Sequence, residues 1–180
     1  MPKKTIFAFA FAFILIATFL LFYYFYTSFT EKKFGAIVGT FNGVPAYSNQ
    51  KGLTKCSDAN YFNGTYTGIK WQCVEYARRY LQTTRGITFD DVEDATLIPF
   101  AKFTTLDGSN HIQITNDLKV GSLVIWPKYY KRNSPDGHVA IISAVQSNGI
   151  YVVEQNYDDE TFQRFIDYND LQDPTFIYPL

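Results

Sequence analysis

The chain has few of the residues on which metal, redox and nucleotide chemistry depends. Its 180 residues include two cysteines, two histidines and one methionine. The sequence has no Cys-x-x-Cys pair, no Cys/His spacing of the kind that binds zinc, and no glycine-rich phosphate loop. We therefore predict neither a metal site nor a cofactor.

A strong net charge of either sign is also lacking. The formal net charge is −1 and the pI is near 6.1. Proteins that bind DNA or RNA usually carry a basic excess that the phosphate backbone attracts, and this chain has none. Nucleic acid is therefore not an expected partner.

Charged residues are missing altogether from residues 5–30, where Phe, Ala, Ile and Leu predominate. A helix over this stretch would be about 39 Å long at about 1.5 Å per residue, more than the roughly 30 Å hydrocarbon core of a bilayer. A cleaved signal segment, the alternative, would have a shorter apolar core, whereas this stretch ends in tyrosines suited to a membrane interface. We predict that residues 1–30 form an N-terminal transmembrane helix that anchors the protein in a membrane.

The lysines that flank this stretch bear on its orientation. Lys3 and Lys4 precede it, and Lys32 and Lys33 follow it beside Glu31, so the net charge favours a cytoplasmic amino terminus although the lysine counts are equal. The expected localisation is a single-pass membrane protein whose domain lies outside the cytoplasm.

Residues 31–180 have the length of one domain. Abundant Gly, Asn, Tyr and Ser predict short strands and turns over residues 35–69, and a helix is expected from residue 73. A second helix is expected over residues 89–103, broken at Pro99. Apolar and β-branched runs then predict strands near 121–126, 138–146 and 150–157, with weaker ones near 163–168 and 175–178. Helices followed by an antiparallel sheet indicate the α+β class.

Cys73 stands at the start of the first of these helices. Val74, Ala77 and Leu81 follow it at the spacing of one buried helix face. A thiol at a helix start faces unpaired backbone N–H groups and the positive end of the helix dipole, which lower its pKa. The alternatives are a small buried hydrophobic residue, or a structural disulfide with Cys56 if the domain is oxidised.

A nucleophilic cysteine needs a base, which is normally histidine, and the chain has only two. His138 opens a β-branched run that is typical of a buried strand, so it is held rigidly and can face a cleft. His111 lies in a polar turn and is expected at the surface. We therefore predict that His138 is the base.

A third group usually orients the imidazole of such a pair. Glu154 and Asn156 lie near the end of the strand after His138, and because they are two residues apart they share a face. The alternative for Glu154 is an ordinary carboxylate at a strand end.

The hairpin that joins these strands decides whether Glu154 reaches His138. A two-residue turn at 148–149 would turn Glu154 to the face away from His138, whereas a three-residue loop at 147–149 would pair Glu154 with Ile142 and restore a common face. His138 would still lie roughly 13 Å away at about 3.3 Å per residue. A bulge or a longer loop is therefore needed to bring the two together.

Four blocks of the sequence resemble, in the same order, those of the CHAP domain family. They are residues 71–79 (WQCVEYARR), 121–126 (GSLVIW), 137–142 (GHVAII) and 154–156 (EQN). The segments 34–39 and 43–48 are in addition similar to the start of the glutathionylspermidine amidases in that family. The resemblance extends over about residues 34–160 and implies a papain-like fold. It also implies Cys73 as nucleophile, His138 as general base and acid, and Glu154 as the orienting residue.

The function implied is that of a cysteine amidase or peptidase. The Cys73 backbone N–H and Gln72 would stabilise the oxyanion, with Asn156 in support. Arg78, one helical turn past Cys73, would meet a substrate carboxylate, unless it is a solvated helix arginine. The implied substrate is a glutathione–polyamine conjugate. A peptidoglycan peptide is the alternative substrate, and a non-catalytic, membrane-tethered peptide-binding module is the alternative function.

Overall fold

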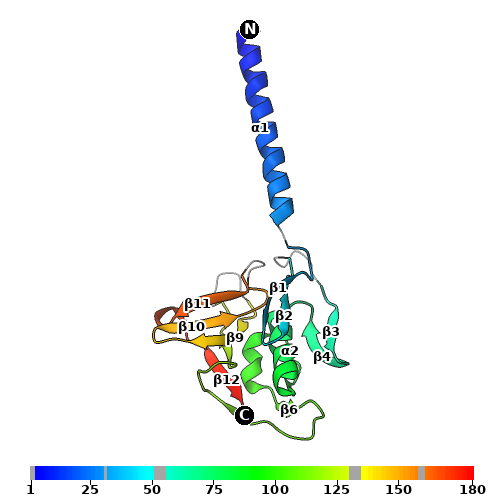
Figure 1. Cartoon of the computed structure of the whole chain (residues 1–180), viewed down its shortest axis with the longest axis vertical. Helices are drawn as coiled ribbons and strands as arrows, with labels where there is room; N and C mark the ends of the chain where they lie inside the picture. The colour runs from blue at the N-terminus through cyan, green and yellow to red at the C-terminus, as the bar shows by residue number, and fades with distance from the viewer. Residues whose placement is uncertain (1–2, 31, 51–55, 130–134, 158–160) are drawn as a thin grey trace. The chain divides into compact units, whose positions relative to one another are not determined.

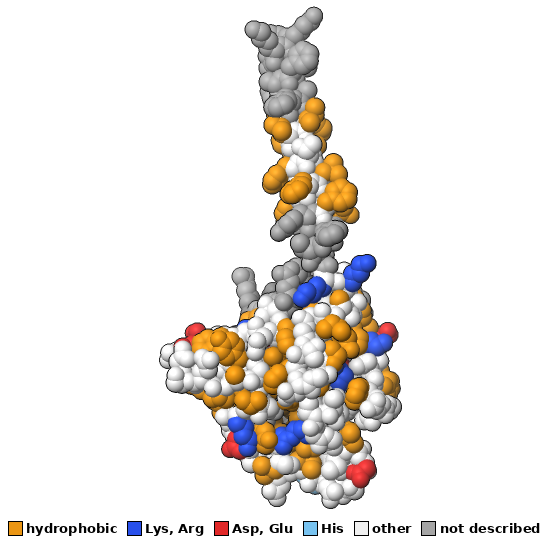
Figure 2. Space-filling view, viewed as in Figure 1, with side chains coloured by type: hydrophobic (Ala, Val, Ile, Leu, Met, Phe, Trp, Pro, Cys, Tyr) orange, Lys and Arg blue, Asp and Glu red, His pale blue; other side chains and the backbone are white. Residues whose placement is uncertain are grey.

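The computed structural model describes residues 3–30, 32–50, 56–129, 135–157 and 161–180, and it divides into two compact units, Met1–Lys32 and Lys33–Leu180. The first unit contains helix α1 (Lys3–Thr30), which confirms the helix expected over residues 5–30. In its described part, hydrophobic side chains from Phe13 to Phe25 are exposed (Figure 2).

A helix needs about 20 predominantly apolar residues to cross a membrane. Within the residues that the structure describes, no helix has both that length and that apolar character. The predicted transmembrane helix over residues 1–30, and the membrane location inferred from it, are therefore not supported.

The second unit combines one long helix with β-hairpins and a larger sheet (Figure 1). Its elements in chain order are β1 (Ile37–Phe41), β2 (Val44–Tyr47), β3 (Ala59–Phe62), β4 (Thr65–Ile69), α2 (Cys73–Arg85), β5 (Ile87–Phe89), the 3₁₀ helix η1 (Ala95–Phe100), β6 (Phe103–Thr105), β7 (Ile114–Thr115), β8 (Leu123–Trp126), β9 (His138–Val145), β10 (Gly149–Val153), β11 (Gln163–Asp167), the 3₁₀ helix η2 (Tyr168–Asp170) and β12 (Thr175–Pro179). The strand order of the larger sheet is β11-β10-β9-β8-β12-β7, and its neighbours pair antiparallel. The α+β class with an antiparallel sheet is confirmed.

Helix α2 packs on one face of the larger sheet. Ala77 and Leu81 of the predicted apolar stripe are fully buried there, beside Ile125, Val139 and Ile141 of the sheet. The residues that alternate with these strand positions build a second core on the other face, namely Val124, Trp126, Ala140, Ile142, Ile150, Val152 and Ile166. The central strands β8, β9 and β10 are therefore largely buried on both faces.

The helix expected over residues 89–103 is wrong. Phe89 and Phe103 pair instead in the antiparallel hairpin of β5 and β6, and only the 3₁₀ helix η1 lies between them. Asp94 caps η1 by accepting a hydrogen bond from the backbone N–H of Thr96 at 2.9 Å, and Pro99 lies inside it. Proline removes a helical hydrogen bond, so the segment does not continue as an α-helix.

The β9–β10 hairpin differs from both turns considered above. The Gln146 N–H donates to the Gly149 carbonyl at 2.8 Å, which leaves only residues 147 and 148 in the turn. The register then shifts by one residue between Tyr151 and Val152, so that Val153 pairs with Ile141. This irregularity is the predicted bulge, and it moves the end of β10 closer to the start of β9.

Candidate active site

Helix α2 begins at Cys73, as predicted. Gln72 is its N-cap, with an extended backbone (φ −83°, ψ 161°), and it makes no side-chain cap. The first backbone N–H groups of a helix have no partner within the helix, so the N–H of Cys73 points outward. Strand β4 approaches this turn closely at Gly68, which has a φ of +139°. A side chain at this position would place its Cβ 3.0 Å from Glu75 Cα, so the close approach requires glycine.

The Cys73 thiol is hydrogen-bonded to the His138 side chain. Burial by itself would raise the pKa of the thiol, but the charge and hydrogen bond of His138, with the N–H groups of Val139 and Val74, bring this pKa below its ordinary value. Burial would likewise lower the pKa of His138, and the Cys73 thiolate and then Glu154 raise it to about 9. The two groups therefore favour a thiolate–imidazolium pair.

His138 Nε2 lies 2.8 Å from Glu154 Oε2. Because this nitrogen faces the carboxylate, Nδ1 is the one left for the thiol. Only 4% of His138 is exposed and none of Glu154 is. Gly137, at φ +66°, precedes the histidine, and a Cβ there would lie 2.6 Å from the Trp126 carbonyl oxygen. The structure thus joins Cys73, His138 and Glu154 in one hydrogen-bonded chain.

Gln72 and Asn156, the predicted supporting residues, touch each other. The Asn156 amide donates to Gln72 Oε1 at 2.6 Å. This contact occupies the oxygen of the Gln72 amide and leaves its NH₂ group as the end that can donate to a substrate. Asn156 therefore contacts Gln72 in the described structure, whereas Glu154 contacts the histidine.

A buried polar network links the start of α2 to the end of β10. Gln155 donates to the Gln72 carbonyl and to Glu75 Oε2, both at 2.9 Å. Glu75 is fully buried and forms an i,i+4 ion pair with Arg79 at 2.6 Å. Arg79 also donates to the Pro45 carbonyl of β2 at 2.6 Å. Sequence patterns did not identify Gln155, because the partners of this network come from segments far apart in the chain.

Arg78 lines the same cleft as Cys73, but its guanidinium is held by the protein itself. It is 1% exposed, and its Cζ lies 4.6 Å from the centre of the Phe89 ring. At 2.8–3.2 Å it donates to the carbonyl oxygens of Thr67, Phe89 and Asp90 and to Asp91 Oδ1. This geometry argues against Arg78 as the ligand of a substrate carboxylate, and equally against a solvated arginine.

The other cysteine and histidine lie elsewhere. Cys56 and Cys73 are both free thiols, so the structure contains no disulfide between them. His111 is exposed and its ring contacts the Ile112 carbonyl oxygen at 3.1 Å, in agreement with the expected surface position.

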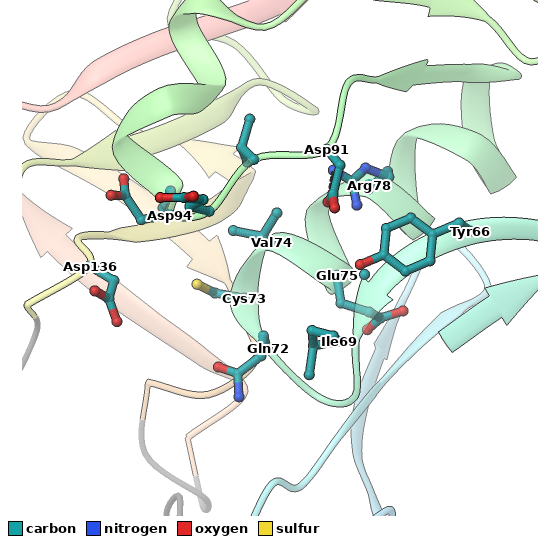
Figure 3. A pocket seen from close by; sticks show the side chains of 14 residues that line it. Tyr66, Ile69, Gln72, Cys73, Val74, Glu75, Arg78, Asp91, Asp94 and Asp136 are labelled. Carbon is teal, nitrogen blue, oxygen red and sulfur yellow. Dashed lines mark hydrogen bonds and ion pairs between the residues drawn. The ribbon is translucent and has the colours of Figure 1, made fainter. Parts of the chain in front are cut away.

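Cys73 opens into a cleft of about 480 Å³ between α2, β4 and the segment before η1. Figure 3 places Asp94 and Asp136 on one side of the thiol and Asp91 and Arg78 on the other. The lining residues are Tyr66, Gly68, Ile69, Gln72, Cys73, Val74, Glu75, Arg78, Asp91, Val92, Glu93, Asp94, Ala95 and Asp136. Among these described lining residues, five carry a carboxylate and one, Arg78, is cationic.

Arg164 was not among the predicted site residues, yet it binds Glu154. Its Nε donates to Oε1 of that carboxylate, and its Nη2 lies 3.4 Å from Oε2. The segment was expected only as a weak strand, and the strand register that places Arg164 opposite Val152 is a tertiary property.

One protein family and several known proteins are similar in sequence to this chain. The family model described as "CHAP domain" matches residues 63–156, just over half of the chain, including Cys73, His138 and Glu154. The chain is 29% identical over 153 residues to the bifunctional glutathionylspermidine synthetase/amidase of Escherichia coli (strain K12), which covers 72% of this chain and 23% of that protein. It is also 29% identical over 133 residues to the trypanothione synthetase of Crithidia fasciculata, which covers 69% of this chain and 20% of that protein.

This chain thus spans less than a quarter of the length of these curated relatives. Among solved structures, N-acetylmuramoyl-L-alanine amidase from Staphylococcus aureus resembles it with a TM-score of 0.45 and 20% identity, over 64% of this chain and 31% of that one. That likeness is too slight to define a fold. The family model that matches residues 63–156 instead shows the family: the chain belongs to the CHAP domain family.

Proposed function

We propose that this CHAP domain is a thiol amidohydrolase of the glutathionylspermidine type, which cleaves the amide bond between a small peptide acyl group and a cationic amine. The observation that carries the proposal is the hydrogen-bonded chain from Cys73 through His138 to Glu154, with the thiol at a cleft. Family membership and the amidase relatives support a hydrolase that acts on amide bonds.

The proposed reaction begins with attack of the Cys73 thiolate on the amide carbonyl carbon. The oxyanion accepts hydrogen bonds from the Cys73 backbone N–H and the Gln72 amide, whose oxygen Asn156 occupies. His138 then gives its proton to the leaving nitrogen, so that the C–N bond breaks and a thioester and a free amine result.

Water completes the cycle. Neutral His138 takes a proton from the water as its oxygen bonds to the thioester carbonyl carbon. The C–S bond then breaks, the acid product leaves, and the thiolate–imidazolium pair is restored. Throughout, the Glu154 carboxylate holds the imidazole with Nδ1 toward the sulfur and stabilises its charged form.

The charge of the cleft supports a cationic leaving group. Protein cations balance two carboxylates of the cleft, since Asp91 pairs with Arg78 at 3.1 Å and Asp94 with Lys128 at 2.7 Å. The negative charge that a ligand would meet comes from Glu93 and Asp136, which also line the cleft. Carboxylates that line a cleft attract cations and disfavour anions. A protonated polyamine matches this wall better than a leaving group that carries carboxylates.

The test is to incubate the full chain with glutathionylspermidine and, separately, with purified muropeptides. We expect release of spermidine, and no release by the Cys73→Ala variant. Asp136→Asn should raise the KM for glutathionylspermidine but not for a glutathione amide of a neutral amine, because a neutral amine does not use the negative charge. Asp117→Asn, which removes an exposed carboxylate of the β7–β8 loop, serves as the matched control.

Two results would replace the proposal. Cleavage of muropeptides without release of spermidine would assign the cell-wall alternative. Binding of the conjugate without turnover, and without a thioester on Cys73, would assign the non-catalytic binding module.

A further inference from the structure

A cross-strand row of side chains contains His138 and Glu154 of the proposed triad. Trp126 of β8 pairs with His138 of β9, and Arg164 of β11 pairs with Val152 of β10, two residues before Glu154. Side chains two residues apart on a strand share a face, and directly paired residues also share one. Trp126 of β8, His138 of β9, Glu154 directly after β10 and Arg164 of β11 therefore follow one another across the sheet.

Arg164 holds both oxygens of the Glu154 carboxylate. Its Nε donates to Oε1, and Nη2 lies 3.4 Å from Oε2, the oxygen that also faces His138 at 2.8 Å. A guanidinium that meets a carboxylate through two nitrogens fixes its orientation as well as its position. Arg164 thereby limits rotation of the carboxylate that faces His138.

The guanidinium is itself held by aromatic rings that also contact the histidine. Arg164 Cζ lies 4.0 Å from the centre of the Tyr157 ring and 5.2 Å from that of Trp126. The centres of these rings lie 5.7 Å and 6.0 Å from that of the His138 ring. Stacking on aromatic faces stabilises an arginine and fixes the plane of its guanidinium. The same Glu154 carboxylate thus faces both Arg164 and His138.

This arrangement has a chemical use that rests on the proposed function. Glu154 is fully buried, and during turnover His138 alternates between imidazolium and neutral imidazole. When the imidazole is neutral, a buried carboxylate without another cation would be costly and would bind a proton more readily. A protonated carboxyl group would no longer stabilise the imidazolium or keep Nε2 as the protonated nitrogen.

We propose that Arg164 is a positioning residue of the proposed triad, which balances the charge of the Glu154 carboxylate and keeps it aimed at His138 while the histidine gains and loses its proton. Among the residues that the structure describes, the charged and titratable groups that contact His138 directly or through Glu154 include Cys73 from α2, Glu154 and Tyr157 from the segment after β10, and Arg164 from β11. Arg164 lies outside residues 63–156, which the family model matches.

The experiment uses the two histidines of the full chain as reporters. With ¹⁵N- and ¹³C-labelled histidine, exposed His111 is an internal reference, and the ring signals of His138 give its tautomer and titration. In Arg164→Met we expect the Glu154 carboxylate to lose its fixed orientation toward His138. The ring of His138 should then lose its single tautomer and titrate at a lower pH than in the parent protein, because Glu154 contributes to its raised pKa.

Cys73 and turnover give independent readouts. The acid limb of Cys73 alkylation should move to higher pH in Arg164→Met, since the thiolate–imidazolium pair is less stabilised. The kcat should fall on the order of tenfold or more with little change in KM. Arg164→Lys should partly restore the kcat and the pH dependence of Cys73 alkylation, because it keeps the charge but not the two-nitrogen contact. Lys119→Met is the matched control: it removes a cation that lies 3.7 Å from the Tyr178 ring centre and pairs with Asp117.

The proposal would be overturned by a folded Arg164→Met variant that behaves like the parent protein in three respects: the His138 tautomer, the His138 titration and Cys73 alkylation. A lower melting temperature of this variant would not change that conclusion. If this variant does not fold, the parent protein decides: the Arg164 Nε–H signal should shift at the pH at which His138 titrates, and an unchanged signal would refute the proposal. Because these measurements need no substrate, their outcome is separate from whether glutathionylspermidine is cleaved.

Discussion

At the scale of residues, the proposed catalytic groups are defined by their partners. His138 is placed between a sulfur and a carboxylate, and it is 4% exposed, so both nitrogens of its ring are committed to protein groups. Asn156, the other candidate for orienting the histidine, contacts the Gln72 amide instead. Two neighbouring polar residues thus serve two different parts of the proposed mechanism.

This division predicts different effects for two substitutions. Glu154→Gln should lower kcat by about two orders of magnitude or more with little change in KM, because the amide does not stabilise the imidazolium. Asn156→Ala should lower kcat less, since it frees the Gln72 amide to rotate without touching His138. Steady-state kinetics and melting temperatures of both variants test this. A larger loss of turnover in Asn156→Ala than in Glu154→Gln would reverse the two roles.

At the scale of elements, α2 is unusual in that its polar side is buried as well as its apolar side. Glu75, Arg78, Arg79 and Gln82 are each at most 5% exposed. Strands β2 and β4 contact the helix, and β5 packs against it too. The polar side chains bind the backbone of these strands, so they connect the nucleophile's helix to the walls around it.

Arg78 provides the test at this scale. Arg78→Ala should lower the free energy of unfolding by about 3 kcal/mol or more, because it leaves buried carbonyl oxygens of β4 and β5 without a donor. Chemical denaturation measures this loss. Arg85→Ala, at the other end of α2, is the comparison, since its guanidinium stacks on Tyr178 with 4.2 Å between Cζ and the ring centre. A fully stable Arg78→Ala protein with a raised KM would instead restore Arg78 as a substrate ligand.

At the scale of the molecule, the proposed site exists only where two parts of the domain meet. Cys73 belongs to the start of α2, whereas His138 and Glu154 belong to the end of the larger sheet. Gln155 bridges these parts through the Gln72 carbonyl and Glu75. The proposed reaction needs the Cys73 sulfur of one part to contact the His138 imidazole of the other. Its pH dependence therefore tests whether these two parts of the domain are packed together.

The sign of this pH dependence follows from the two pKa shifts. The pKa of Cys73 is lowered and that of His138 is raised to about 9, so the thiolate–imidazolium pair persists across neutral pH. We expect kcat/KM to fall as the pH rises through about 9, because His138 then lacks the proton that the leaving amine needs.

Iodoacetamide should label Cys73 faster than Cys56 near pH 7, as peptide mass spectrometry would measure.

Activity that instead rises through pH 9, with equal and slow labelling of the two cysteines, would contradict the ion pair. Cys73→Ala controls for labelling at other sites.

The sequence by itself determined the local features of this protein. It predicted the start of α2 at Cys73, the strands that became β8 to β12, the surface position of His111 and the CHAP resemblance. These depend on side-chain periodicity and on short motifs, which are properties of neighbouring residues. The helix expected over residues 89–103 failed because Phe89 and Phe103 pair across the chain, an interaction that no local pattern contains.

Only the tertiary structure decided which polar groups meet. The register shift in β10 brings Glu154 to His138, and the pairing of β11 brings Arg164 to Glu154. The hairpins around α2 bury Arg78 and give its guanidinium backbone carbonyl partners. Burial makes each of these contacts necessary, since a charge removed from water must find a partner, and that partner comes from whichever strand folds against it.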